Sequence, residues 1–389
     1  MILSKKIIQR FMFDTLEKGI QIGSLTVTTP EKHTRLFQGS EPGVNANWEI
    51  KDWKAVQTVA SRGDIGLGEA YVQGLWDTND LETLFRVFID NFEHLEEASC
   101  GNWLNQIWYR LLNQVIRRNS IKGSTQNIRS HYDVGNDFYK LWLDPSMTYS
   151  SGLYTNDTNP LEVAQANKYN RILGKIGSER RRILEIGCGW GGFAEQAISN
   201  GHAVTGLTIS RQQHDFATRR LGKAADIRIQ DYRHVEGKFD AIASIEMFEA
   251  VGIRYWPEYF RTLKNRLAKD GVAMVQTITI KDHAFDNYLN QSDYIRHYVF
   301  PGGLLPSVKK FREYAEKSGL MCREVFAFGQ DYARTLREWL ARFDASEKAI
   351  RNLGYSTEFI RSWRIYMHMC AASFANSRTN VVQIELAHA

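Results

Sequence analysis

Hydrophobic and polar positions follow one pattern in the N-terminal third of the chain. Apolar residues recur every three or four positions near the N-terminus, broken by Lys5, Lys6 and Arg10, and again over 100–118. Between these two predicted helices lie the strand-like segments 23–30 and 47–50, and Asp80 is placed to cap a helix in TNDLETLF. The helix over 100–118 either packs into a core or presents a basic amphipathic face to lipid headgroups.

A different pattern begins near residue 180. Short apolar runs alternate with helical stretches, which is typical of a doubly wound α/β sheet. The polar stretch 119–130 separates the two patterns, and we place the domain boundary there, giving a smaller α+β domain over 1–120 and an α/β domain over 121–389. The predicted strands are 181–187, 202–209, 239–245 and 271–280, and the predicted helices are 193–201 and 256–271.

Composition excludes several classes of function. The chain has 389 residues, 43% of them hydrophobic and 24% charged, as in soluble globular proteins. A net charge of +5 without a basic stripe argues against nucleic acid, although it suits an anionic membrane surface. Four scattered cysteines predict neither disulfides nor a zinc site, and hence no metal and a reducing cytoplasm. No apolar run is long enough to span a bilayer, so we expect lipid contact only from the surface.

A glycine-rich turn carries the first chemical signal. The sequence ILEIGCGWGG over 183–192 places Gly187, Gly189 and Gly192 between a predicted strand and a predicted helix. Such glycines allow a tight turn and a close approach of a ligand to the backbone. The pattern alone is a weak signal, compatible with NAD, with SAM or with a turn that binds nothing.

Acidic residues near this turn favour S-adenosylmethionine (SAM) over NAD. Glu185 immediately precedes the glycines, and an acidic side chain there suits a ligand that carries an amine and no phosphate. The second strand ends in Thr208 and Ser210, without the acidic residue that reads the NAD ribose. Asp231, in IQDYR, follows the third strand and could meet the adenine amino group. We therefore interpret the turn as a SAM site.

Seven motifs together resemble one family. The motifs HYDVGNDFYKLWLDPSMTYSSGLY, EIGCGWGGFA, TGLTIS, QDYR, MFEAVG, YVFPGGLLPS and GQDYARTL are similar in order and spacing to the cyclopropane fatty acid synthase family, which includes the mycolic acid methyltransferases. The resemblance covers roughly 126–389. The earlier segment GEAYVQGLWD resembles the N-terminal domain of longer bacterial members.

This resemblance implies a Rossmann-like, SAM-dependent methyltransferase that methylates the double bond of an unsaturated fatty acyl chain in a membrane phospholipid. It implies a lipid-associating domain over 1–120, a catalytic domain over 121–389, a peripheral position at the inner face of the membrane, and a homodimer. Most of the SAM contacts follow from the family's motifs, and Glu185 is added from the argument above. They are Tyr149, Ser150, Glu185, Gly187, Gly189, Thr208, Gln213, Asp231, Tyr232 and Ile245.

The family chemistry also implies a base. An alkene that attacks the sulfonium methyl becomes a carbocation, which aromatic faces stabilise and water would quench. A bound bicarbonate then removes a proton, held by a cysteine, a glutamate, a histidine, an isoleucine backbone and a tyrosine. Glu249, Ile278 and Tyr332 match this set, whereas Ser151 replaces the cysteine and Gln276 the histidine. Both replacements still donate hydrogen bonds.

Alternatives remain open at this stage. The replacements at Ser151 and Gln276 in the expected bicarbonate site motivate a methyl-branched or methylene-branched product instead of a ring. A lipid-binding protein with a degenerate cofactor site and an NAD-linked oxidoreductase are further hypotheses. The aromatic residues Tyr294, Tyr298 and Phe300, with His297, either line an acyl tunnel or simply pack, and Cys188 is interpreted as a packing residue.

Overall fold

The computed structural model describes residues 5–100 and 134–389. The predicted helix over 100–118, the polar boundary over 119–130 and the histidine of the HYD motif, His131, lie outside the described residues apart from Cys100. The described residues form two compact units. The first takes in the chain up to Cys100 together with Ser292–Pro301 and Ile350–Asn376; the second comprises Val134–Gln291, Gly302–Ala349 and Ser377–Ala389.

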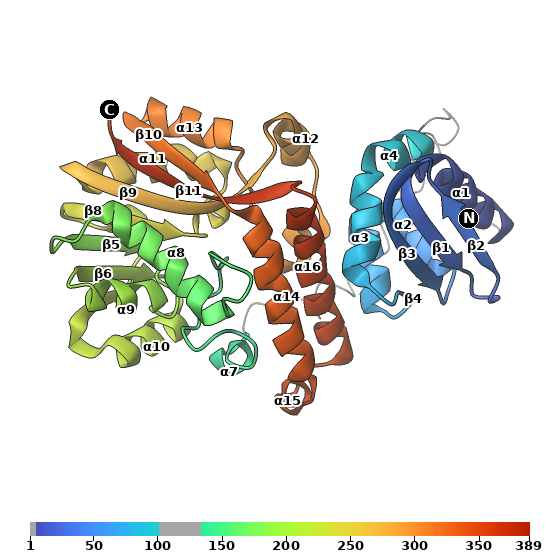
Figure 1. Cartoon of the computed structure of the whole chain (residues 1–389), viewed down its shortest axis with the longest axis horizontal. Coiled ribbons are helices and arrows are strands. Elements are labelled where there is room, and N and C mark those ends of the chain that lie inside the picture. The colour runs from blue at the N-terminus through green and yellow to red at the C-terminus, as the bar shows by residue number, and fades with distance from the viewer. Residues whose placement is uncertain (1–4, 101–133) are drawn as a thin grey trace. The chain divides into compact units, whose positions relative to one another are not determined.

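The first unit combines helices with a small sheet (Figure 1). Asp80 caps α3 by accepting a hydrogen bond from the Thr83 N–H at 3.0 Å, as its position before an apolar run predicted. The sheet has the order β2-β1-β3-β4. The elements of the first unit are α1 (Lys5–Gly19), β1 (Ile22–Thr28), β2 (Thr34–Gln38), β3 (Glu41–Ile50), α2 (Lys54–Val72), β4 (Trp76–Asp77), α3 (Leu81–Asp90), α4 (Phe92–Cys100), the π-helix η7 (Ile295–Val299) and α16 (Thr357–Ala375).

Two segments from the C-terminal half complete this unit. Tyr294 and Tyr298 from one segment and Ile365 from α16 join the apolar core of the first unit. Arg361 of α16 also donates a hydrogen bond to the Tyr71 carbonyl at 2.7 Å. Both segments fall within the range 121–389 that the sequence assigns to the catalytic domain, and no local pattern predicted their return.

The second unit contains a seven-stranded sheet in the order β10-β11-β9-β8-β5-β6-β7. The strands from β9 to β7 in this order are parallel, and β11 and β10 are added antiparallel at one edge. This is the α/β, Rossmann-like arrangement that the alternating pattern predicts. The strands are β5 (Arg182–Ile186), β6 (Ala203–Thr208), β7 (Ala225–Ile229), β8 (Phe239–Ile245), β9 (Leu267–Ile280), β10 (Leu320–Ala327) and β11 (Thr379–His388).

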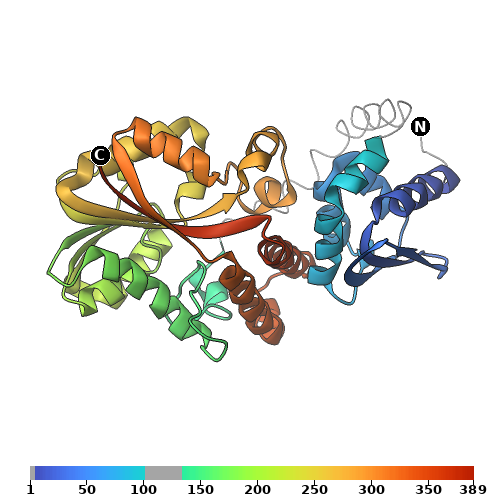
Figure 2. The ribbon, with the colours of Figure 1, turned by 45° about the horizontal axis from the view of Figure 1, so that its top comes forward.

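Helices cover both faces of this sheet (Figures 1 and 2). The α-helices are α7 (Asn136–Tyr139), α8 (Leu161–Ile176), α9 (Gly192–Ser199), α10 (Arg211–Leu221), α11 (Trp256–Arg266), α12 (Phe285–Asn290), α13 (Val308–Lys317), α14 (Gly329–Ala345) and α15 (Glu347–Asn352). Short 3-10 turns are η2 (Gly222–Ala224), η3 (Tyr232–His234), η4 (Phe248–Ala250), η5 (Ile253–Tyr255) and η6 (Asp282–Ala284).

Successive residues of a strand pack into two different apolar cores, one on each face of the sheet. Ile183 packs with α8 and α9 on one face, while its neighbour Leu184 packs with α11 and α13 on the other. The helix predicted over 256–271 ends earlier, at Arg266. Leu267 is extended (φ −73°, ψ 133°) and pairs with Phe239 of β8, so the stretch Leu267–Gly271 belongs to β9. Strand pairing overrides the helical pattern at this point.

Candidate active site

The glycine turn lies where the sequence predicted it, between β5 and α9. Gly187 and Gly189 have φ of +83° and +53°, a region that favours glycine. The Gly187 and Cys188 N–H groups both donate to the Leu207 carbonyl, at 3.0 and 2.8 Å. A Cβ at Gly187 would lie 2.8 Å from the Met247 side chain. The turn therefore brings bare backbone to the carboxyl edge of the sheet, where α/β proteins bind ligands.

Glu185 supplies an acidic group beside this turn. Its side chain is buried, and among the described residues its Oε2 has no hydrogen-bond partner. Burial raises the pKa of Glu185 to about 8, and the positive charge of Lys168 opposes that rise. A buried carboxyl oxygen without a partner is costly. The amine of an amino-acid ligand such as SAM would satisfy it, so this residue fits the predicted cofactor.

The next two strands bring further predicted contacts to the same edge. Thr208 ends β6, and its hydroxyl donates to Gln213 Oε1 at 2.8 Å. Asp231 follows β7, caps η3 and accepts from the Arg233 N–H at 3.0 Å. The Arg233 guanidinium lowers the pKa of Asp231, so this acceptor stays ionised at neutral pH.

Two more predicted contacts follow the third and fourth parallel strands. The ring of Tyr232 meets that of Tyr259 edge-on at 5.6 Å between centroids. Ile245 is the last residue of β8 and lies opposite Gln276 of β9. The predicted cofactor residues that follow β5, β6, β7 and β8 thus all lie at the carboxyl edge of the parallel strands.

Aromatic rings surround Tyr149, in the segment SMTYSSGLY. We call this group the aromatic cluster: Tyr139, Trp142, Tyr149, Trp190 and Trp339. The Tyr149 ring lies 5.6 Å from Tyr139, 5.6 Å from Trp142 and 5.3 Å from Trp339, and Tyr139 lies 5.0 Å from Trp190. Such rings stabilise a cation through their faces.

Ser150 is held by a buried lysine. The Lys168 ammonium donates to Ser150 Oγ and to Gln165 Oε1, both at 2.6 Å, and the Gln165 amide donates to the Ser150 carbonyl at 2.9 Å. Lys168 is fully buried. Burial lowers its pKa to about 7, while the negative charges of Glu246, Asp144 and Glu185 oppose the decrease.

Glu246 is the centre of the site. Its Oε1 accepts from the Ser151 N–H at 2.9 Å and from the Gln276 amide at 2.8 Å, and its Oε2 accepts from the Tyr332 hydroxyl at 2.6 Å. Gln276 is oriented in turn by Gln383, whose amide donates to Gln276 Oε1 at 3.0 Å. We call Glu246 and its three donors the carboxylate pocket.

The backbone at Glu246 is unusual. Its φ is +49°, a left-handed conformation that few residues other than glycine adopt, and its N–H donates to the Gln276 carbonyl at 2.8 Å. Burial raises the pKa of Glu246, while Lys168 and the three donors oppose that rise. The site therefore holds a desolvated carboxylate in a fixed position.

Glu249 has different partners. Its Oε1 accepts from the Ile278 N–H at 2.5 Å and from the Thr277 hydroxyl at 3.0 Å. Its Oε2 is buried and has no hydrogen-bond partner among the described residues. Burial and the nearby charge of Glu246 raise the pKa of Glu249 to about 8. At neutral pH this group is mostly a neutral acid.

The five residues predicted as catalytic therefore divide into two groups. Ser151, Gln276 and Tyr332 meet at Glu246, whereas Glu249 and Ile278 bind each other. The Ser151 side chain turns away, because its hydroxyl donates to the Gly152 carbonyl at 2.9 Å. The predicted bicarbonate does not fit this arrangement: three of its expected donors already bind a carboxylate of the chain, whose charge would repel a second anion.

Sequence reasoning missed Glu246, Lys168 and Gln165. Glu246 directly follows the buried strand β8, at the sheet edge where α/β sites form, and this position was a usable signal. Gln165 and Lys168 lie three residues apart on the buried face of α8. Polar residues on an apolar helix face require partners, and that requirement was a second signal.

Two of the aromatic residues for which the sequence left tunnel lining and simple packing open pack in the first unit. The Tyr294 hydroxyl lies 2.8 Å from Ser362 Oγ, and the Tyr298 hydroxyl donates to Glu69. Both rings are buried in the apolar core of that unit. Cys188, predicted to pack, is buried, and burial raises the pKa of its thiol.

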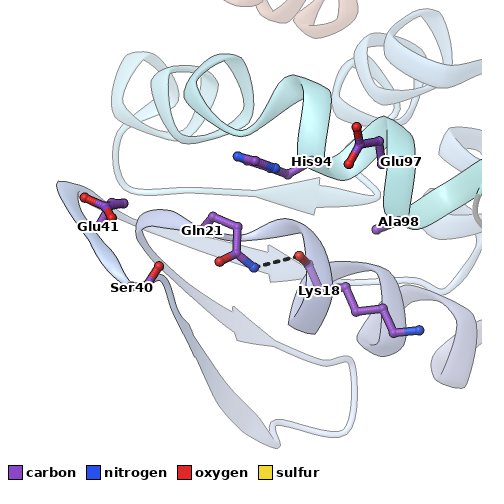
Figure 3. Close-up of a pocket in the computed structure, with 7 residues that line it drawn as sticks. All are labelled: Lys18, Gln21, Ser40, Glu41, His94, Glu97 and Ala98. Atoms are coloured by element: carbon purple, nitrogen blue, oxygen red, sulfur yellow. Dashed lines mark hydrogen bonds between the residues drawn. The ribbon is translucent and has the colours of Figure 1, made fainter.

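A polar hollow in the first unit contains none of the predicted site residues. It has a volume of about 450 Å³, and in Figure 3 the Gln21 amide reaches the Lys18 carbonyl across one side of it. Its lining residues are Lys18, Gln21, Ser40, Glu41, His94, Glu97 and Ala98. In the described part of the chain, no helix is long and apolar enough to cross a bilayer, and no group of three acidic, histidine or cysteine side chains could hold a metal.

Comparison with known proteins agrees with this geometry. The family described as mycolic acid cyclopropane synthetase matches residues 119–384. The chain belongs to this family. The cyclopropane-fatty-acyl-phospholipid synthase of Escherichia coli is 36% identical over 343 residues, covering 87% of this chain and 86% of that protein. The tuberculostearic acid methyltransferase UfaA1 of Mycobacterium tuberculosis is 32% identical over 343 residues, covering 84% and 79%.

A solved structure agrees with the assignment to the cyclopropane synthetase family. The mycolic acid cyclopropane synthase CmaA1, complexed with SAH and CTAB, matches with a TM-score of 0.62 and 28% identity, over 69% of this chain and 99% of that one. The chain is thus a SAM-dependent methyltransferase with a Rossmann-like fold, as its motifs predicted.

Proposed function

We propose that this enzyme transfers a methyl carbon from SAM to the double bond of an unsaturated fatty acyl chain in a membrane phospholipid, with a cyclopropane ring as the main product. The observation that carries the proposal is the adjacency of the aromatic cluster and the carboxylate pocket. Tyr332 bridges them: its hydroxyl binds Glu246 and its ring lies 6.1 Å from that of Trp339. A cation-stabilising surface and a base are what methylation of an alkene requires.

The chain's own residues divide the work of binding. Bound SAM supplies an electrophilic methyl group on a positively charged sulfur. We propose that Glu185 binds its amine, that the backbone at Gly187 and Gly189 admits it closely, and that Thr208 and Asp231 bind its nucleoside end. The remaining proposed contacts are Tyr149, Ser150, Gln213, Tyr232 and Ile245.

Shielding from water is a second requirement, and the groups that surround the partly buried Glu246 contribute to it. Ser151, Gln276 and Lys168 are inaccessible to solvent, and Tyr332 is 6% exposed. A carbocation formed between the cluster and the carboxylate pocket would be shielded from attack by water long enough to lose a proton.

The lipid context is a separate part of the proposal. The Escherichia coli relative is named for a fatty-acyl-phospholipid substrate, and the net charge of +5 suits an anionic surface. We propose peripheral contact with the inner face of the membrane through the first unit, and a homodimer. Co-sedimentation with anionic and neutral vesicles tests the first point, and light scattering after gel filtration tests the second.

A branched product is the second candidate. The replacements at Ser151 and Gln276 in the expected bicarbonate site favour it. Loss of a proton from the cation gives either a cyclopropane or a methylene branch, and both add one CH₂. A saturated methyl branch requires in addition a hydride donor. The two proton-loss products are isomers, so mass alone does not distinguish them.

The test is a product analysis. Methyl-labelled SAM is incubated with the enzyme and vesicles of phospholipid with monounsaturated chains, and the released fatty acids are examined by mass spectrometry and proton NMR. We expect label in the acyl chain and upfield ring-proton signals. Olefinic methylene signals would favour the branched product, and unlabelled lipid in the presence of bound SAM would refute the proposed function.

A further inference from the structure

We propose that the Glu246 carboxylate is itself the base of the reaction and that this enzyme works without bicarbonate. The proposal rests on the proposed function, because a base is needed only if the enzyme forms the carbocation. It assigns a catalytic role to a residue that the family motifs did not indicate. It also explains why the residues expected to hold bicarbonate differ in this chain.

The first argument is the use of the donors. The Ser151 N–H, the Gln276 amide and the Tyr332 hydroxyl, three groups expected to hold bicarbonate, converge on the two oxygens of Glu246 at 2.6–2.9 Å. A carboxylate and a bicarbonate have similar planar oxygen pairs, so the same donors serve either. Because like charges at short range raise each other's free energy, a pocket that holds one excludes the other.

The second argument is the backbone of Glu246. A residue with a side chain at φ +49° is strained relative to glycine. Such outliers cluster at functional sites, where the surrounding structure enforces them. Here the bond from the Glu246 N–H to the Gln276 carbonyl holds the backbone, while the Gln276 side chain holds the carboxylate. One residue thus fixes both ends of Glu246.

The third argument is the charge around the pocket. Lys168 is fully buried and interacts electrostatically with Glu246. Its positive charge favours the ionised form of Glu246, whereas burial favours the neutral acid. The raised pKa makes the ionised Glu246 a stronger base than an exposed glutamate, while Lys168 and the three donors limit that rise, which suits proton abstraction.

The proposed step conserves atoms and charge. The alkene π electrons form a C–C bond to the methyl group while the sulfonium C–S bond breaks, leaving a neutral thioether and a carbocation on the acyl chain. An oxygen of Glu246 then takes a proton from the new methyl group, and the C–H electrons close the ring. The protonated Glu246 gives its proton to water when product leaves. No reductant or oxidant is needed.

The experiment compares the intact enzyme with and without bicarbonate. Transfer of labelled methyl to unsaturated phospholipid vesicles is measured in buffer purged of carbon dioxide and in the same buffer with added bicarbonate. We expect the same turnover in both. A fall of tenfold or more on purging, restored by bicarbonate, would overturn the proposal while leaving the proposed function intact.

Two substitutions at one position sharpen the result. Glu246→Gln keeps an acceptor for the donors and removes the base, so we expect turnover to fall by about 10²–10⁴-fold with SAM affinity within about threefold of wild type. Glu246→Gly removes the side chain at a backbone position that glycine tolerates and frees the three donors. We expect added bicarbonate to restore part of the activity of Glu246→Gly and none of that of Glu246→Gln.

The control is Glu236→Gln, the same chemical change on the exposed surface of the second unit. It should match wild type in turnover and in bicarbonate independence. Wild-type turnover by Glu246→Gln would refute the role of Glu246. If wild type binds SAM but labels no lipid, the proposed function fails and this inference fails with it, which is a different outcome from bicarbonate dependence.

Discussion

Glu246 and Glu249 lie three residues apart after β8, and their carboxyl groups differ in hydrogen-bond partners and in nearby charge. Glu246 receives hydrogen bonds on both oxygens and lies in the field of Lys168. Glu249 receives hydrogen bonds on Oε1 only, and the neighbouring negative charge of Glu246 raises its pKa to about 8. Burial raises the pKa of both groups, but Lys168 and three hydrogen-bond donors oppose that rise at Glu246, whereas the charge of Glu246 adds to it at Glu249.

Environment therefore separates the roles of two identical side chains. Pairs of acids whose surroundings move their ionisation apart are typical of active sites. A protonated Glu249 is suited to fixing the backbone at Ile278 and not to accepting a proton from substrate. The comparison predicts graded effects of substitution, according to how directly each change alters the ionised state of Glu246.

The largest of these effects is expected for Lys168→Met. Without the ammonium, the pKa of Glu246 rises further, because burial is then less opposed. At a pH below the pKa, each unit by which the pKa rises lowers the ionised fraction of Glu246 about tenfold. Turnover at pH 7 should therefore fall by about tenfold to a hundredfold. The acidic limb of the pH profile should move to higher pH, with activity recovering in alkaline buffer. Lys223→Met, on an exposed turn, is the control, and a loss that is uniform across pH would assign Lys168 a purely structural role.

Tyr332→Phe should have the next largest effect. It removes one hydrogen bond to a charged oxygen, and such bonds contribute about 1.5–3 kcal/mol. We expect about tenfold lower turnover and a smaller alkaline shift of the same limb, with SAM affinity preserved. Tyr314→Phe, outside the site, keeps wild-type kinetics if the effect belongs to the hydroxyl on Glu246. An equal loss of SAM affinity would mean that Tyr332 binds cofactor.

The residues proposed to bind SAM at the carboxyl edge of the sheet could be predicted from the sequence, because the signals for them are local. Gly187 and Gly189 adopt the positive φ that their strand-to-helix position requires, and Glu185 immediately precedes them. The start of α11 was equally local, since Pro257 is favoured in the first turn of a helix. The end of α11 could not be predicted from local signals, because Leu267 pairs with Phe239, which is 28 residues earlier in the chain.

The carboxylate pocket could not be predicted in the same way. Glu246 is adjacent to a family motif, but its direction depends on a backbone conformation that no local pattern indicates. Ser151, Gln276 and Tyr332 were found by resemblance, yet the acceptor they share follows only from long-range packing of β8, β9 and α14. The same limit applies to Tyr294 and Tyr298, which join the first unit from a segment far along the chain.

Glu249→Gln should have a small effect on turnover and a larger one on the pH dependence of stability. An amide resembles the protonated acid that predominates at pH 7, and it can still accept from Ile278, so turnover should stay within about threefold of wild type. The folded state keeps the Glu249 proton up to about pH 8, whereas the unfolded state loses it near pH 4.5. Burial of this acid therefore destabilises the wild-type fold increasingly as pH rises from about 5 to 8.

Urea unfolding measures this difference directly. The unfolding free energy of Glu249→Gln relative to wild type should increase across that pH range, by about 1–2 kcal/mol, because partial exposure of the side chain reduces the full effect. A flat difference would place the pKa of Glu249 near its ordinary value. A loss of turnover as large as that of Glu246→Gln would reverse the assignment of the base.

The smallest effect is expected for Ser151→Ala, next to Ser150. Ser151 holds Glu246 through its backbone N–H, which alanine keeps, and its hydroxyl only reaches the Gly152 carbonyl. Turnover should therefore stay within about twofold of wild type, with a stability loss of about 1 kcal/mol. Ser150→Ala is the matched contrast, because it removes an acceptor from the buried Lys168 ammonium, and we expect about fivefold lower turnover. Steady-state kinetics of the two variants decide the point: a stronger effect of Ser151→Ala would mean that its side chain, and not its backbone, contributes to the pocket.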